Sequence, residues 1–133
     1  DMEKVERLQL PYYERLAEVT GDASYLYTLL HFHFGERDWE SFHYWLEQAM
    51  SAGFYEEDPY LKGLHANALI FQGEYREAAE LHKEALETGS DHRNIGHLLA
   101  LELMLGTDPD EVKELAKQYP YYEYTTEKEG LVD

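Results

Sequence analysis

Apolar residues recur at intervals of three and four along most of the chain, which is the spacing of one face of an α-helix. Six stretches carry this pattern and predict helices over residues 22–34, 38–52, 58–73, 75–89, 95–105 and 109–119. No stretch alternates between apolar and polar residues with a period of two, and β-branched residues are scarce. The sequence therefore predicts an all-α fold with essentially no sheet.

Capping residues indicate where several of these helices start and end. Asp22 and Asp58 each precede a helix, and Pro59 suits a first helical position, where no amide hydrogen is needed. Gly35 is expected to interrupt the first of the six helices. Gly53 is expected to end the second helix in the left-handed conformation, which glycine adopts at small cost.

The two ends of the chain differ from the central stretches. A helix over about residues 11–19 is expected to line one of its sides with Leu8, Leu10, Tyr13, Leu16 and Val19. Pro11 either starts this helix or kinks a longer one. Residues 1–21 are interpreted as a helical cap on the first hairpin, or as a functional arm. Residues 120–133 are expected to form a Tyr-rich tail that either covers the last helix or docks on a neighbouring chain or on the protein's own groove.

The six central helices form three pairs that repeat along the sequence. Trp39, Tyr75 and Pro109 open the second helix of each pair, at offsets of 36 and 34 residues. The predicted hairpins cover residues 22–53, 58–89 and 91–119, between the segments 1–21 and 120–133. The middle hairpin is the most regular, and its pattern is carried by Ala66, Gly73, Tyr75, Ala78, Ala85 and Leu86.

This pattern resembles the tetratricopeptide repeat (TPR) family, whose unit is a helix-turn-helix of about 34 residues. The resemblance covers residues 22–119 and is most specific in the middle hairpin, because bulky Phe42, Val112 and Tyr119 replace expected small residues in the other two. It implies a right-handed α-solenoid of about three TPR-like repeats with an N-terminal helical cap. One hairpin cannot bury its apolar side alone, so neighbouring hairpins are expected to stack.

The resemblance also implies a function and a binding surface. The first helix of each TPR hairpin lines the concave face of the stack, where a peptide or a partner protein binds. The inward positions in this chain would be Tyr27, His31, Phe34, Tyr60, Asn67, Ile70, Asn94, His97 and Leu101. TPR proteins that bind a C-terminal carboxylate use Lys, Arg and Asn on this face, and Asn67 alone matches that set. The prediction is a non-enzymatic protein-protein interaction module or scaffold.

Two alternatives stay open: a self-assembling homo-oligomer unit, and a metal-binding helical protein or enzyme that uses the histidines. His31 and His33 are two residues apart, whereas ligands on one helix face need a spacing of three or four. Glu36, Glu40 and His43 have that spacing, but across the expected break at Gly35. The serines lack a nucleophile context and no phosphate-binding loop is present, so we predict no metal, no cofactor and no catalytic residues.

Composition and charge restrict the partners. The chain of 133 residues has 11 Lys and Arg against 28 Asp and Glu, a formal net charge of -17. This excess disfavours nucleic acids and anionic membranes. It allows two interpretations, a solubilising surface or a field that steers a basic partner. The sequence has no cysteine, no apolar run long enough for a membrane span and no apolar signal segment in its first ten residues, so a cytoplasmic location is expected.

Overall fold

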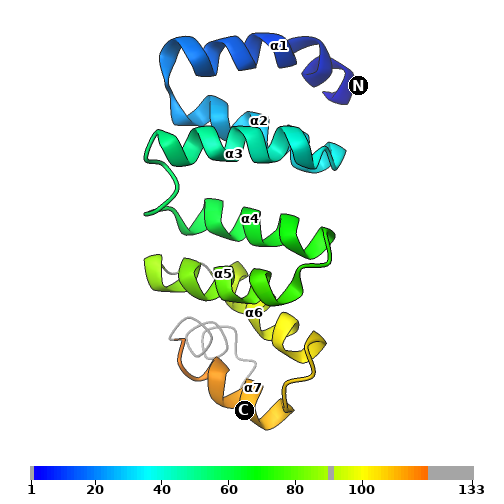
Figure 1. Ribbon diagram of the computed structural model, residues 1–133, viewed down its shortest axis with the longest axis vertical. Helices are drawn as coiled ribbons and strands as arrows, with labels where there is room; N and C mark the ends of the chain where they lie inside the picture. Colours follow the sequence, from blue (N-terminus) through cyan, green and yellow to red (C-terminus); the bar gives the residue numbers. More distant parts are fainter. Residues whose placement is uncertain (1, 90–91, 120–133) are drawn as a thin grey trace. The chain divides into compact units, whose positions relative to one another are not determined.

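The computed structural model describes residues 2–89 and 92–119, and over these residues the chain forms seven helices and no strand (Figure 1). They are α1 (Met2–Thr20), α2 (Ala23–Glu36), α3 (Trp39–Ser51), α4 (Pro59–Phe71), α5 (Tyr75–Thr88), α6 (His92–Met104) and α7 (Pro109–Ala116). The predicted all-α class is confirmed, whereas the predicted tail, residues 120–133, lies outside the described residues. Over the described ranges, no helix is long and apolar enough to cross a membrane.

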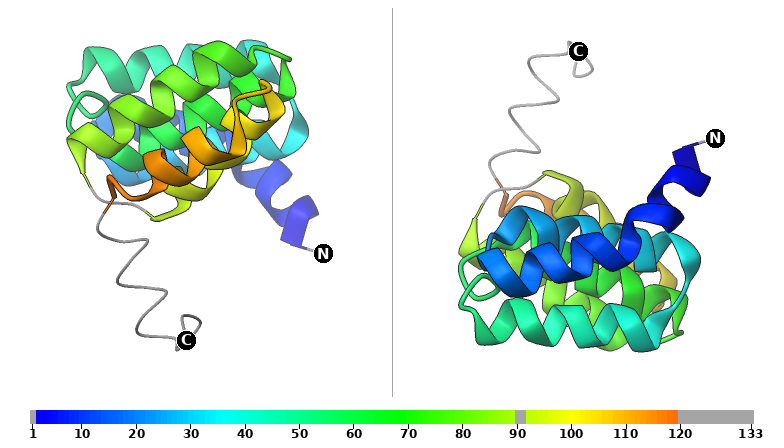
Figure 2. Two further views of the ribbon diagram at one scale, coloured as in Figure 1. Left: turned by 90° about the horizontal axis from the view of Figure 1, so that it is seen from below. Right: turned by 90° about the horizontal axis from the view of Figure 1, so that it is seen from above.

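The helices divide between two compact units, Asp1–Tyr55 and Glu56–Asp133. In the first unit α1 packs against α2, and α2 against α3. In the second unit α4 packs against α5, α5 against α6, and α6 against α7. Figure 2 gives two further views in which α1 can be followed along α2. Within each unit, helices that are consecutive in the sequence are therefore neighbours in space.

The helix starts follow the predicted capping chemistry. The Asp22 side chain accepts a hydrogen bond from the backbone N–H of Ser24 at 2.9 Å, and Asp58 accepts from the backbone N–H of Tyr60 at 2.9 Å. Each aspartate satisfies an amide that has no partner within its own helix. Gly53 has a φ of +85° after α3, so the predicted left-handed glycine is confirmed.

The predicted interruption at Gly35 is wrong. Helix α2 continues through Gly35 to Glu36, and the left-handed residue that ends it is Arg37, with φ at +60°. The Arg37 side chain donates a hydrogen bond to the Phe34 carbonyl oxygen at 2.7 Å, and its guanidinium lies 5.3 Å from the centroid of the Phe34 ring. These contacts offset part of the strain that a non-glycine residue has at positive φ.

The predicted apolar side of the N-terminal helix is also corrected. Helix α1 is continuous through Pro11, and its buried or half-buried side carries Leu10, Tyr13 and Ala17. Leu8 and Val19, which were expected on that side, are 67% and 65% exposed. Leu8 and Leu10 are two residues apart, so they point in directions about 200° apart around a helix.

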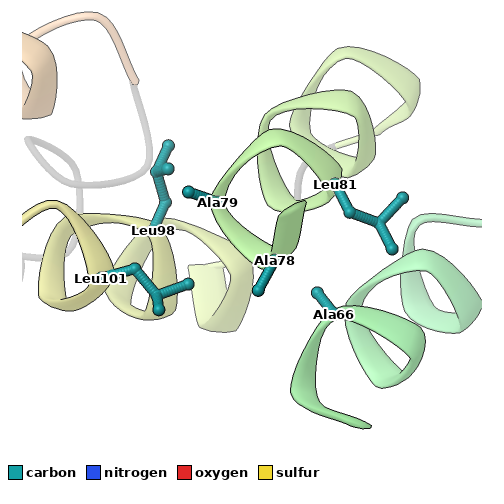
Figure 3. Packing of buried hydrophobic residues seen from close by; sticks show 6 residues of the cluster. All are labelled: Ala66, Ala78, Ala79, Leu81, Leu98 and Leu101. Carbon is teal, nitrogen blue, oxygen red and sulfur yellow. The ribbon is translucent and has the colours of Figure 1, made fainter. Parts of the chain in front are cut away.

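The core of the second unit is built around small residues at the crossing of α4, α5 and α6. Ala66 and Ala78 are fully buried and point toward one another from α4 and α5 (Figure 3). Ala79 of α5 points toward Leu98 of α6 in the same view. Side chains of this size let helix axes approach closely, so a larger residue at Ala78 would have to displace a neighbouring helix.

Candidate functional site

The first unit contains a cleft between α1 and α2 with a volume of about 420 Å³. Two of the nine predicted binding residues, Tyr27 and His31 of α2, line this cleft. The other lining residues have no site role predicted from the sequence, and they are Glu6, Leu10, Tyr13, Thr28 and Phe32. Tyr27 and His31 are four residues apart on one helix and therefore face the same side. We call this site the α1–α2 cleft.

The charged residues Glu6 and Arg7 lie beside the α1–α2 cleft and differ in their surroundings. Glu6 brings a carboxylate to its wall. The neighbouring Arg7 forms an ion pair with Glu36 and lies 5.9 Å from the centroid of the Phe32 ring. The Arg7 charge is thus compensated by Glu36, whereas Glu6 is an exposed acidic residue that lines the cleft.

His31 and Thr28 determine what chemistry the α1–α2 cleft offers. Burial lowers the pKa of His31 from its usual value of 6.5, so the ring is neutral at neutral pH. The Thr28 hydroxyl donates a hydrogen bond to the Ser24 carbonyl oxygen at 3.1 Å, and its proton is therefore not given to the imidazole. This arrangement provides hydrogen-bonding groups for a ligand and lacks an activated Thr28 nucleophile.

Phe34, the third predicted residue of the first unit, lies in an aromatic cluster instead. Its ring contacts Trp39 edge-on at 5.5 Å and Phe42 at 5.9 Å between centroids. Phe42 is fully buried, so the cluster joins the end of α2 to the start of α3. Phe34 therefore stabilises this hairpin and does not line the α1–α2 cleft.

Two predicted residues of the second unit are buried inside it. Asn94 is 3% exposed, and its Oδ1 accepts a hydrogen bond from Nδ1 of His82 at 2.8 Å. Its Nδ2 donates to the Pro59 carbonyl oxygen at 3.2 Å, which fixes the orientation of the amide and hence the His82 tautomer. Leu101 is 1% exposed and belongs to the core of α4, α5 and α6.

The remaining four predicted residues are partly accessible, and three of them have a packing role. The Arg93 guanidinium lies 5.4 Å from the centroid of the Tyr60 ring, and Ile70 packs against the core around Ala66. The His97 ring stacks on His82 with centroids 5.4 Å apart. Asn67 Oδ1 is buried and accepts no hydrogen bond from the described residues.

Among residues 2–89 and 92–119, no group of three His, Cys, Asp or Glu side chains is placed to hold a metal ion. His33, two residues from His31, is buried, and its Nδ1 lies 3.9 Å from an Asp38 carboxylate oxygen. The two histidines thus face different surroundings, as their spacing predicts.

Comparisons of the chain with protein-family models, with curated proteins and with solved structures gave no match. The TPR resemblance therefore depends on the residues of this chain alone, and no family is assigned.

Proposed function

We propose that this chain is a non-enzymatic protein-binding module that receives a basic side chain of a peptide or partner protein in the α1–α2 cleft. The observation that carries the proposal is the composition of the cleft wall. Tyr13, Tyr27 and Phe32 supply aromatic surface, and Glu6 supplies a carboxylate beside it. A volume of about 420 Å³ is within the range of sites that take small ligands or single side chains.

A lysine or arginine side chain fits this combination of groups. Its aliphatic stem can pack on tyrosine and phenylalanine rings while its charged end approaches a carboxylate. A cation over an aromatic face adds roughly 0.5–2 kcal/mol, depending on how far it is desolvated. His31 is neutral near pH 7 because burial lowers its pKa, so it does not repel an incoming cation.

The net charge favours the same class of partner. With 28 acidic residues against 11 basic ones, the chain attracts basic segments over distances of about a Debye length. Such attraction raises association rates more than it raises the final affinity. The long-range field and the wall of the cleft therefore favour the same ligand charge.

We further propose that the hairpin of α4 and α5 is TPR-like and presents one side of α4 as part of a binding surface. Ala66 and Ala78 meet at its helix crossing, and Gly73 at its turn has a φ of +81°. The half-buried Asn67 of α4 is one of the inward positions that the TPR resemblance implies for this surface.

A displayed library of random peptides, selected on the immobilised protein, tests the proposal. We expect selected peptides to be enriched in Lys or Arg at a fixed position. Binding of one selected peptide is then measured by calorimetry to the protein and to two variants, Glu6→Gln and Tyr27→Ala. Each variant should weaken binding about tenfold, which corresponds to ~1.4 kcal/mol.

Glu47→Gln on α3 is the matched control, because Glu47 is exposed and does not line the α1–α2 cleft. It removes the same charge as Glu6→Gln and should leave the affinity nearly unchanged. Peptides without basic enrichment would contradict the proposal. So would equal affinities of the native protein and both cleft variants.

A further inference from the structure

Helix α1 carries a second apolar face that no other described residue of the first unit covers. Five of its residues, between 38% and 71% exposed, form a stripe: Val5, Leu8, Tyr12, Leu16 and Val19. The stripe lies about 130° around the helix from the side formed by Leu10, Tyr13 and Ala17. The other large apolar side chains exposed on the described residues are spread over four helices, so α1 concentrates them.

The order of residues in the stripe is the same in both directions. It reads Val, Leu, Tyr, Leu, Val, with intervals of three, four, four and three residues. Turning the helix end over end about Tyr12 therefore superimposes the pattern on itself. Valine meets valine, leucine meets leucine and tyrosine meets tyrosine. A second, antiparallel copy of α1 therefore presents a stripe that matches the first one residue for residue.

We propose that the stripe on α1 is the interface of a symmetric homodimer, in which two α1 helices pack antiparallel about a two-fold axis at Tyr12. Closed two-fold assemblies use the same patch on both subunits, and a self-complementary stripe is such a patch. Val5 of one copy then faces Val19 of the second copy, and Leu8 faces Leu16. Packing of β-branched and leucine side chains in alternating layers is typical of paired helices.

The charges around the stripe support a second copy of this acidic chain as the occupant. Lys4 and Arg15 flank one side of the stripe, and Gln9 and Thr20 flank the other. Among residues 4–20 no carboxylate lies within about 100° of the centre of the stripe. The two copies therefore avoid carboxylate repulsion at the contact, although each has a net charge of -17.

The same register also fixes which charged residues of the two copies lie at similar heights along the helix axes. In an antiparallel pair centred on Tyr12, Lys4 of one copy and Glu18 of the second copy differ by about 3 Å along the helix axis. Both residues lie on the same side of the stripe, Lys4 about 80° and Glu18 about 120° from its centre. Glu18 also forms an ion pair with Arg15 of its own chain at 3.5 Å. The dimer interface and the α1–α2 cleft lie on different sides of α1, so this proposal does not rest on the proposed function.

Sedimentation of the whole chain over a range of concentrations tests the dimer. A stripe of five side chains is a small interface, so we expect the dimer to form between about 1 and 500 µM. Leu8→Glu should weaken the association at least tenfold, because it places a carboxylate opposite leucine in both halves of the interface. Leu103→Glu on α6 is the matched control, since Leu103 is 52% exposed and lies outside α1.

Cysteine cross-linking tests the antiparallel register directly, because the chain has no cysteine of its own. Tyr12→Cys lies on the two-fold axis and should form a disulfide between copies under mild oxidation. Val5→Cys alone should not, since its two copies would be roughly 20 Å apart along the helix pair. A mixture of Val5→Cys and Val19→Cys should cross-link one chain of each kind.

Several results would overturn the proposal. A monomer at every concentration would do so, as would a dimer that Leu8→Glu and Leu103→Glu affect equally. Cross-linking of Val5→Cys to itself without cross-linking of Tyr12→Cys would exclude the proposed register. A lower thermal midpoint of Leu8→Glu than of Leu103→Glu, measured on monomeric samples, would mean that another part of the same chain covers the stripe.

Discussion

Asn94 of α6 is hydrogen-bonded to α4 and α5, and these bonds allow a quantitative test of how the second unit is packed. Gly63 lies on α4 opposite Asn94, and a methyl group at this position would overlap Asn94 Oδ1. The amide would have to move by roughly 1 Å to regain van der Waals separation. Such a movement breaks the 2.8 Å hydrogen bond from His82 and strains the bond to the Pro59 carbonyl oxygen.

The expected magnitude for Gly63→Ala follows from these contacts. A buried polar group that loses its partner costs about 1–3 kcal/mol, and two such groups are affected. The gain in helix propensity from glycine to alanine offsets up to ~1 kcal/mol of this. We expect the free energy of unfolding to fall by about 1–5 kcal/mol, measured by urea denaturation with far-UV circular dichroism.

A double-mutant cycle separates this contact from general effects of the substitution. In the Asn94→Ala background the obstacle is absent, so Gly63→Ala should stabilise the chain by about 0.5–1 kcal/mol. Gly96→Ala on α6 is the control, because a methyl group at Gly96 would meet open space and should stabilise the native protein by a similar amount. Stabilisation by Gly63→Ala in the native background, or an equal effect in both backgrounds, would refute the reasoning.

Three further predictions concern packing, capping and pH. Ala78→Phe should lower the free energy of unfolding by about 1–3 kcal/mol by overpacking the helix crossing, whereas Glu80→Phe on the exposed side of α5 should have little effect in the same urea assay. Hydrogen bonds from Ser24 and Ser41 lower the pKa of Asp22 and Asp38, respectively, below 3.8. The two ionised aspartates therefore stabilise the fold above that pH, and this stabilisation is lost as the pH falls through their pKa in the folded state. Replacing both by asparagine should therefore reduce the loss of stability measured between about pH 5 and pH 2; an unchanged pH dependence would count against these caps. Burial lowers the pKa of His31 below 6.5, so calorimetry should show that a basic peptide binds more weakly as the pH falls through that pKa, a step that His31→Gln removes.

The helices were largely predictable because their signals are local. Asp22 and Asp58 cap helices where the sequence indicates, since the capping hydrogen bonds join residues two or three apart. The end of α2 was missed because glycine at position 35 is the usual signal for a stop. The actual stop at Arg37 depends on a hydrogen bond and a ring contact that the sequence pattern does not reveal.

The site was less predictable, because periodicity shows which residues share a face but not what covers that face. Helix α1 has apolar residues on two sides, and only packing decides that Leu10 and Tyr13 face α2 while Leu8 faces outward. Asn94 was expected on a binding surface because the TPR resemblance implies an inward position for it. It is instead enclosed by α4 and α5, where its hydrogen bonds to His82 and Pro59 compensate its burial.

The central claim, that the α1–α2 cleft binds a basic segment of a partner, is tested most directly by NMR. A selected basic peptide is titrated into the isotope-labelled chain and the changes in amide chemical shift are mapped. We predict that the largest changes fall on the residues around Glu6, Tyr13, Tyr27 and His31 and that they are lost in the Glu6→Gln, Tyr27→Ala double variant. Changes of equal size in that variant, or changes confined to the second unit, would contradict the claim.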